Sequence, residues 1–137
     1  MSTRFKFKTT QTVRFSDTDA MGHANNSHFF NYLEEGRVAY FQSLYADCNL
    51  KKATEIFPFI LADIQCTFKA PLYAADTIDV WLGVTEIKNS SFVIEYDIIE
   101  TAKNTLVAIA RSVQVCFDYE KGKPMPIPQN LRERFHL

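Results

Sequence analysis

The hydrophobic and polar positions of this chain change their period twice. From Thr9 to Ser16 polar and apolar residues alternate, which predicts a strand, and a polar loop follows over residues 17–27. Helical spacing then predicts an amphipathic helix from about Ser27 to Ala46, with Asn26 or Ser27 as its N-cap. Its apolar face consists of Phe29, Leu33, Gly36, Tyr40 and Leu44.

After Pro58 the period becomes two and stays so. The alternation predicts four strands, over residues 60–68, 78–84, 92–99 and 106–117. The last three are joined by short turns, Lys88–Ser91 and Thr101–Asn104, so they should form antiparallel hairpins. A short helix is expected at Gln129–Phe135. We therefore predict one α+β domain over residues 1–137, with a long helix against an antiparallel sheet.

Composition narrows the class of protein. Hydrophobic residues make up 47% of the chain and aromatic residues 14%, while the formal net charge is −1. The nearly balanced charge shows no excess of basic residues of the kind that binds nucleic acid or an anionic membrane surface. Several strands carry apolar residues on both faces, so the face of the sheet away from the helix must also be buried. This suggests a homo-oligomer, a dimer or a tetramer.

The cysteines and the N-terminus indicate the compartment. Cys48, Cys66 and Cys116 are odd in number and lie far apart, which argues against a disulfide framework. Met1–Thr10 lacks the apolar run of a signal peptide, and no stretch approaches the roughly 18 apolar residues of a membrane helix. We therefore expect a soluble, cytoplasmic protein.

The polar loop carries the candidate chemistry. Asp17 and Asp19 precede Gly22, and polar residues then open the helix. A helix N-terminus offers unpaired N–H donors that can stabilise an oxyanion, and a nearby carboxylate can activate water or attack directly. Gly22 permits an unusual backbone dihedral or a close ligand. Acids near a helix N-terminus are also favourable without catalysis, so the residues alone leave a plain capping loop open.

Residues 15–37 resemble the signature of the 4-hydroxybenzoyl-CoA thioesterase-like family, which includes the thioesterases associated with the Tol–Pal system. The family pattern is D-x-D-x-x-G, a short polar stretch, then aromatics, an acid and often an arginine on the long helix. The matching residues are Asp17, Asp19, Gly22, Phe29, Tyr32, Glu34 and Arg37. The resemblance implies the hotdog fold, a long helix wrapped by a curved sheet of about five strands.

The resemblance also implies roles for particular residues. Asp19 falls on the family's catalytic acid, as general base or nucleophile, and the oxyanion donor falls on a backbone N–H near Asn26. Asp17 then organises the loop. The family's CoA contacts fall on the turn before the third long strand, where Lys88 is the single basic residue, followed by Asn89, Ser90 and Ser91. Because active sites in this family form between subunits, a dimer is the minimum unit implied.

Other residues near the loop have two interpretations each. His23 either shuttles a proton or bonds to backbone, and Asn25 and Ser27 either contact substrate or belong to the turn and cap. Glu34 either faces the pocket from a partner subunit or pairs with Arg37. Phe57 either lines an acyl pocket or lies in the core. The scattered histidines argue against a metal site, and no cofactor is expected.

The leading hypothesis is hydrolysis of acyl-CoA thioesters to free acid and CoA. The alternatives are a non-catalytic protein that binds acyl-CoA or acyl-carrier-protein thioesters, and a hotdog enoyl-thioester hydratase, which usually needs a histidine paired with an acid. No G-x-S-x-G elbow and no G-x-G-x-x-G or Walker loop is present, which disfavours serine-nucleophile and nucleotide-cofactor chemistry. The sequence leaves the acyl group open.

Overall fold

The computed structural model describes residues 4–45 and 59–135. In chain order, its elements are β1 (Phe7–Thr12), the 3-10 turn η1 (Phe15–Asp17), α1 (Asn26–Leu44), β2 (Phe59–Phe68), β3 (Thr77–Ile87), β4 (Ser91–Glu100), β5 (Thr105–Asp118), β6 (Lys123–Pro124) and α3 (Gln129–Arg134).

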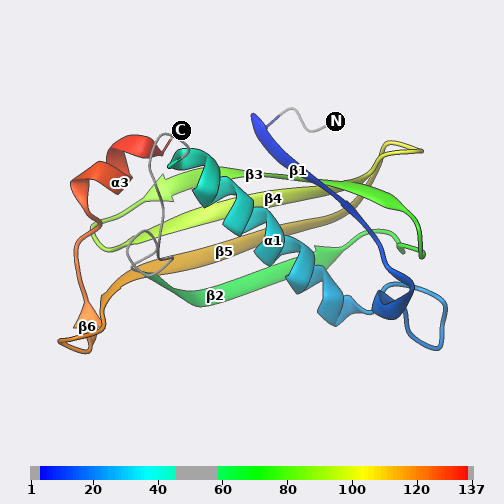
Figure 1. Ribbon diagram of the computed structural model, residues 1–137, viewed down its shortest axis with the longest axis horizontal. Helices are drawn as coiled ribbons and strands as arrows, with labels where there is room; N and C mark the ends of the chain where they lie inside the picture. Colours follow the sequence, from blue (N-terminus) through cyan, green and yellow to red (C-terminus); the bar gives the residue numbers. More distant parts are fainter. Residues whose placement is uncertain (1–3, 46–58, 136–137) are drawn as a thin grey trace.

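The strands form one antiparallel sheet, which α1 crosses diagonally on one face (Figure 1). The strand order is β1-β3-β4-β5-β2, and the two-residue β6 pairs with the end of β5. The predicted α+β arrangement of one long helix on an antiparallel sheet is confirmed, with β6 as an additional short strand. β2 is the next element after α1 among the described residues, yet it lies at the opposite edge of the sheet from β1, so both are edge strands.

The first strand ends earlier than the alternation predicted. β1 stops at Thr12, and residues 15–17 turn away as η1 instead of extending to Ser16. The reason is local, because the Asp17 carboxylate accepts the Arg14 N–H at 3.0 Å and closes a capping box that bends the chain.

The ends of both helices also differ from the prediction. Asn25 is the N-cap of α1, so the prediction of Asn26 or Ser27 was wrong by one residue. The helix ends at Leu44, with Tyr45 as its C-cap, and Ala46 lies outside the described residues. α3 ends at Arg134, one residue short of the predicted bound.

The core lies between α1 and the sheet. The apolar face of the helix meets the alternate residues of β3, β4 and β5 that point toward it, and most of these are fully buried. Aromatic rings fill the space beside the C-terminal end of α1. Their centroids are separated by 4.7 Å for Phe41 and Phe59, by 5.4 Å for Phe59 and Phe92, and by 4.7 Å for Phe92 and Phe135.

Gly36 lets α1 lie close to β3. A Cβ at this position would lie 3.1 Å from Cγ1 of Val80, a fully buried β-branched side chain. Gly36→Val should therefore lower the free energy of unfolding by about 1–3 kcal/mol through overpacking. Denaturant titration would measure the loss. Ala39→Val, on the outer side of the same helix, is the control and should cost no more than about 1 kcal/mol. Equal losses of unfolding free energy in the two variants would contradict the close contact between Gly36 and Val80.

Candidate active site

The acidic loop between η1 and α1 is a closed hairpin. Asp19 N–H donates to the His23 carbonyl at 2.9 Å, and Gly22 N–H donates back to the Asp19 carbonyl at 2.9 Å. Thr18 and Ala24 pair as an antiparallel bridge. Gly22 has φ +80°, which confirms the unusual dihedral expected there and explains the glycine. The turn places Asp19 directly across from His23.

Asp19 lies at the exposed tip of this hairpin. Its Oδ1 accepts the Met21 N–H at 2.9 Å, which fixes the direction of the carboxylate. The other oxygen, Oδ2, meets no donor among the described residues. The carboxylate is therefore oriented by the loop while one oxygen stays available to a substrate or a water molecule.

The first amides of α1 are not all satisfied. The Ser27 N–H donates to the Asn25 side chain at 3.0 Å, and the His28 N–H donates to the Asn25 carbonyl at 2.9 Å. The Asn25 N–H donates to the Asp17 carbonyl at 2.8 Å. The Asn26 N–H finds no acceptor within the described parts of the chain. At a helix N-terminus such a free donor, aided by the helix dipole, is suited to bind an oxyanion.

A cavity of about 280 Å³ lies beside this donor. Its lining residues come from the loop, from the start of α1 and from the end of β2. They are His23, Ala24, Asn26, Phe29, Phe68, Lys69, Ala70 and Pro71. Ala24 N–H donates to the Leu72 carbonyl at 2.7 Å, so the loop is tied to the segment after β2. The His23 ring also meets Tyr73 edge-on, with centroids 5.2 Å apart.

Sequence reasoning missed every cavity residue from the end of β2 onward, Phe68 and Lys69 among them. Both lie at the end of β2, more than forty residues from the acidic loop, and only the packing of β2 against α1 brings them to the site. No local motif surrounds them. Lys69 supplies a positive charge to a cavity that otherwise holds apolar groups, an amide and an imidazole.

Asp17, unlike Asp19, is buried, with 1% of its surface exposed. Its carboxylate accepts from the Arg14 N–H at 3.0 Å, from Arg14 Nη2 at 3.2 Å and from Tyr32 Oη at 2.9 Å. Burial raises the pKa of the Asp17 carboxyl, but these hydrogen bonds and the Arg14 charge outweigh it and leave the pKa below its ordinary value. For Tyr32, burial and then the bond to Asp17 raise the pKa. The role of loop organiser fits these contacts.

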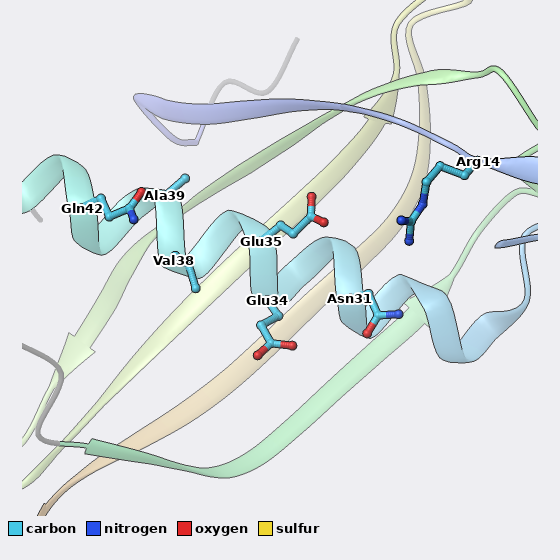
Figure 2. A pocket seen from close by; sticks show the side chains of 7 residues that line it. All are labelled: Arg14, Asn31, Glu34, Glu35, Val38, Ala39 and Gln42. Atoms are coloured by element: carbon cyan, nitrogen blue, oxygen red, sulfur yellow. The ribbon is translucent and has the colours of Figure 1, made fainter. Parts of the chain in front are cut away.

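Glu34 lies away from the cavity. It borders a separate hollow of about 430 Å³ on the outer face of α1, where Figure 2 shows Arg14 pointing toward the helix. The pair with Arg37, one of the two interpretations of Glu34, does not form; Arg37 Nη1 instead donates to Tyr96 Oη at 3.3 Å. Phe57 lies outside the described residues.

The predicted CoA-binding turn is not near the loop of the same chain. Lys88, Ser90 and Ser91 lie at the end of β3, whereas the loop lies beyond its start, where Thr77 pairs with Thr12 (Figure 1). The eleven residues of β3 separate the two by about 30 Å. Lys88 Nζ instead lies 3.7 Å from Glu86 Oε1. These residues can join an Asp19 site only through another copy of the chain.

Other kinds of site find little support in residues 4–45 and 59–135. No group of three histidine, cysteine or acidic side chains there could hold a metal ion. Cys66 and Cys116 are free thiols, and burial raises the pKa of each to about 11. None of the helices in these two ranges has the length and apolar character needed to cross a membrane.

Comparison with known proteins gives a consistent result. Residues 13–135 match the family model of the thioesterase-like superfamily. The chain is 29% identical over 130 residues to the 1,4-dihydroxy-2-naphthoyl-CoA hydrolase of Rippkaea orientalis, which covers 90% of this chain and 91% of that protein. It is also 30% identical over 94 residues to YsmA of Bacillus subtilis. That match covers 69% of this chain and 61% of YsmA.

A solved structure from Thermus thermophilus, described as a thioesterase complexed with coenzyme A and zinc, superposes with a TM-score of 0.84. Its sequence is 27% identical, and the match covers 98% of this chain and 94% of that one. The predicted hotdog fold is thereby confirmed.

Proposed function

Because this chain belongs to the thioesterase-like superfamily, we propose that it hydrolyses acyl-CoA thioesters to free acid and CoA. One observation carries the proposal. Asn26, whose N–H is unpaired among the described residues, opens α1 and lines the cavity. The adjoining hairpin contributes His23 to the same lining and presents the Asp19 carboxylate, which does not itself line the cavity, with one oxygen free. An oxyanion donor and a carboxylate carried by one continuous segment are sufficient groups for acyl transfer to water.

The reaction follows from these two groups. The thioester carbonyl oxygen accepts the Asn26 N–H, so the negative charge that develops on attack meets a fixed donor and the positive end of the helix dipole. In the general-base route, water attacks the carbonyl carbon and gives a proton to Asp19. The C–S bond then breaks, and the CoA thiolate takes up that proton.

In the nucleophilic route, an Asp19 oxygen attacks the carbonyl carbon itself. CoA leaves, and water hydrolyses the resulting anhydride. Both routes yield one acid and one CoA. Labelled oxygen from water that enters Asp19 during a single turnover would support the nucleophilic route, since it requires attack of water on the aspartyl carbon of the anhydride.

Product analysis separates hydrolysis from the two alternatives. Incubation with an acyl-CoA, followed by chromatography of both products, should give free acid and CoA in equal amounts. A binding protein would release neither, and a hydratase would convert an enoyl-CoA to a product that still carries CoA. Either of those results would overturn the proposal.

We further propose that the working unit is at least a homodimer, built on the β2 edge. β2 carries no neighbour on its outer side within the described chain and exposes Ile60, Leu61 and Phe68 by 38%, 44% and 38%. An edge strand with exposed apolar side chains is a surface for pairing with another chain. A second copy there would also be the means to bring a Lys88 turn to the site.

The substrate carrier is proposed to be CoA rather than an acyl carrier protein. CoA is named for two of the similar proteins, the 1,4-dihydroxy-2-naphthoyl-CoA hydrolase and the thioesterase complexed with coenzyme A. Lys69 offers a phosphate of the carrier a positive charge at the cavity, which a bare pantetheine thioester does not use. The free thiols of Cys66 and Cys116 support a reducing, cytoplasmic setting for this reaction.

Lys69 gives the phosphate contact a direct test. Lys69→Ala should raise KM for an acyl-CoA about fivefold, because an exposed charge–phosphate contact contributes on the order of 1 kcal/mol. KM for the same acyl group on pantetheine should not change. Lys6→Ala, an exposed lysine before β1, is the control and should leave both values unaltered. A rise in KM for both substrates would exclude a phosphate role for Lys69.

A further inference from the structure

Tyr32 connects the buried Asp17 to the second turn of α1. Its hydroxyl donates to Asp17 Oδ2 at 2.9 Å, and both residues are almost fully buried, at 4% and 1% exposed. On the other side of the carboxylate, Arg14 holds both oxygens through its backbone N–H and its guanidinium. His28 Nδ1 lies 3.5 Å from Oδ1. Asp17 therefore joins the segment after β1 to the helix.

The same residue closes the base of the hairpin through its backbone. The Asp17 carbonyl accepts the Asn25 N–H at 2.8 Å, directly before the Asn26 N–H. Asp19 follows two residues later, and its N–H donates to His23 on the opposite arm. Displacement of Asp17 would therefore move the carboxylate and the oxyanion donor relative to each other.

We propose that Tyr32 is a positioning residue for catalysis, which holds Asp17 so that Asp19 and the Asn26 N–H face the same thioester carbon. Tyr32 does not line the cavity. Its ring packs edge-on against Phe29, a lining residue, with centroids 5.8 Å apart, and its hydroxyl acts through Asp17. The inference rests on the proposed function. It adds that this hydrogen bond controls the rate of the chemical step, because small misplacements of reacting groups reduce rates strongly.

Tyr32→Phe tests the inference, since it removes only the hydroxyl. The helix supplies a matched control in Tyr40→Phe, because Tyr40 is equally buried, at 4% exposed, and its hydroxyl makes no hydrogen bond to the loop. Tyr32→Phe should lower kcat about tenfold and leave KM within about twofold of wild type. Tyr40→Phe should change neither constant by more than about twofold. Hydrogen exchange at the Asp19 and Asn25 amides should accelerate in Tyr32→Phe alone.

Each outcome bears on one proposal. Suppose that wild type hydrolyses acyl-CoA. An unchanged kcat in Tyr32→Phe would then overturn the positioning role, and so would an equal loss of kcat in Tyr32→Phe and Tyr40→Phe. Neither result would affect the proposed thioesterase activity. A change in KM alone would also overturn the positioning role, because that result indicates binding rather than alignment. If wild type hydrolyses no acyl-CoA, the proposed function fails. Amide exchange in Tyr32→Phe then still tests whether Tyr32 holds the loop. Unaltered exchange at the Asp19 and Asn25 amides would refute the positioning role too.

Discussion

Asp19→Asn is expected to lower kcat for acyl-CoA hydrolysis by about a thousandfold, the scale of an essential general base or nucleophile. Asparagine retains a side-chain oxygen that can accept the Met21 N–H, so the turn should persist. Because Asp19 is exposed, its replacement removes no core contact, and the thermal midpoint should stay within a few degrees of wild type. Steady-state kinetics and a thermal melt on the same preparation measure both.

The chain contains a matched control for this change. Asp118 also caps a turn, since its Oδ1 accepts the N–H groups of Glu120 and Lys121 at 3.0 Å each, but it lies at the β5–β6 end. Asp118→Asn should retain wild-type kcat. A similar loss in both variants would mean that an altered turn, and not the missing carboxylate, explains the result.

Asp17→Ala is expected to lower the free energy of unfolding by about 3 kcal/mol at pH 7. The Arg14 N–H and the buried Tyr32 hydroxyl would lose their acceptor, and unsatisfied buried groups are costly. Asp79 provides the comparison, because it bonds Lys8 and Thr10 on the surface of the sheet. Asp79→Ala should cost no more than about 1 kcal/mol. Denaturant titration of the two variants measures the difference.

The pH dependence of the Asp17 effect has a definite sign. Hydrogen bonds and the Arg14 charge overcome burial and lower the pKa of this carboxyl in the folded state. Its ionised form therefore stabilises the fold fully above the ordinary aspartate pKa of about 3.9, and this contribution is lost as the pH falls through the lowered value. The difference in the free energy of unfolding between wild type and Asp17→Ala should therefore become smaller below about pH 4. A difference that becomes larger on acidification would contradict the assigned ion pairs.

Much of the fold followed from periodicity in the sequence. The spacing of Phe29, Leu33 and Tyr40 indicated the buried face of α1, and the period of two indicated β2 to β5 to within a few residues. These signals are strong because burial selects one face of each element. The early end of β1 was not predictable in the same way, since it depends on where the Asp17 side chain finds its donors.

The site was predictable where it is local in sequence. The acidic hairpin and the helix start are one continuous segment, so their proximity required no tertiary information. Choosing Asn25 as the N-cap among three consecutive polar residues required the hydrogen bond to Ser27. Lys69 and the Tyr32–Asp17 bond were missed because strand order and helix packing create them, and neither leaves a pattern along the chain.

The most direct measurement is thiol release from short, medium, long and aromatic acyl-CoAs, with purified wild type and Asp19→Asn side by side. The proposed function predicts turnover of at least one substrate class by wild type and its collapse in the variant, with equal binding of the substrate by both. Absence of thiol release from every acyl-CoA, or full turnover by Asp19→Asn, would contradict acyl-CoA hydrolysis at Asp19.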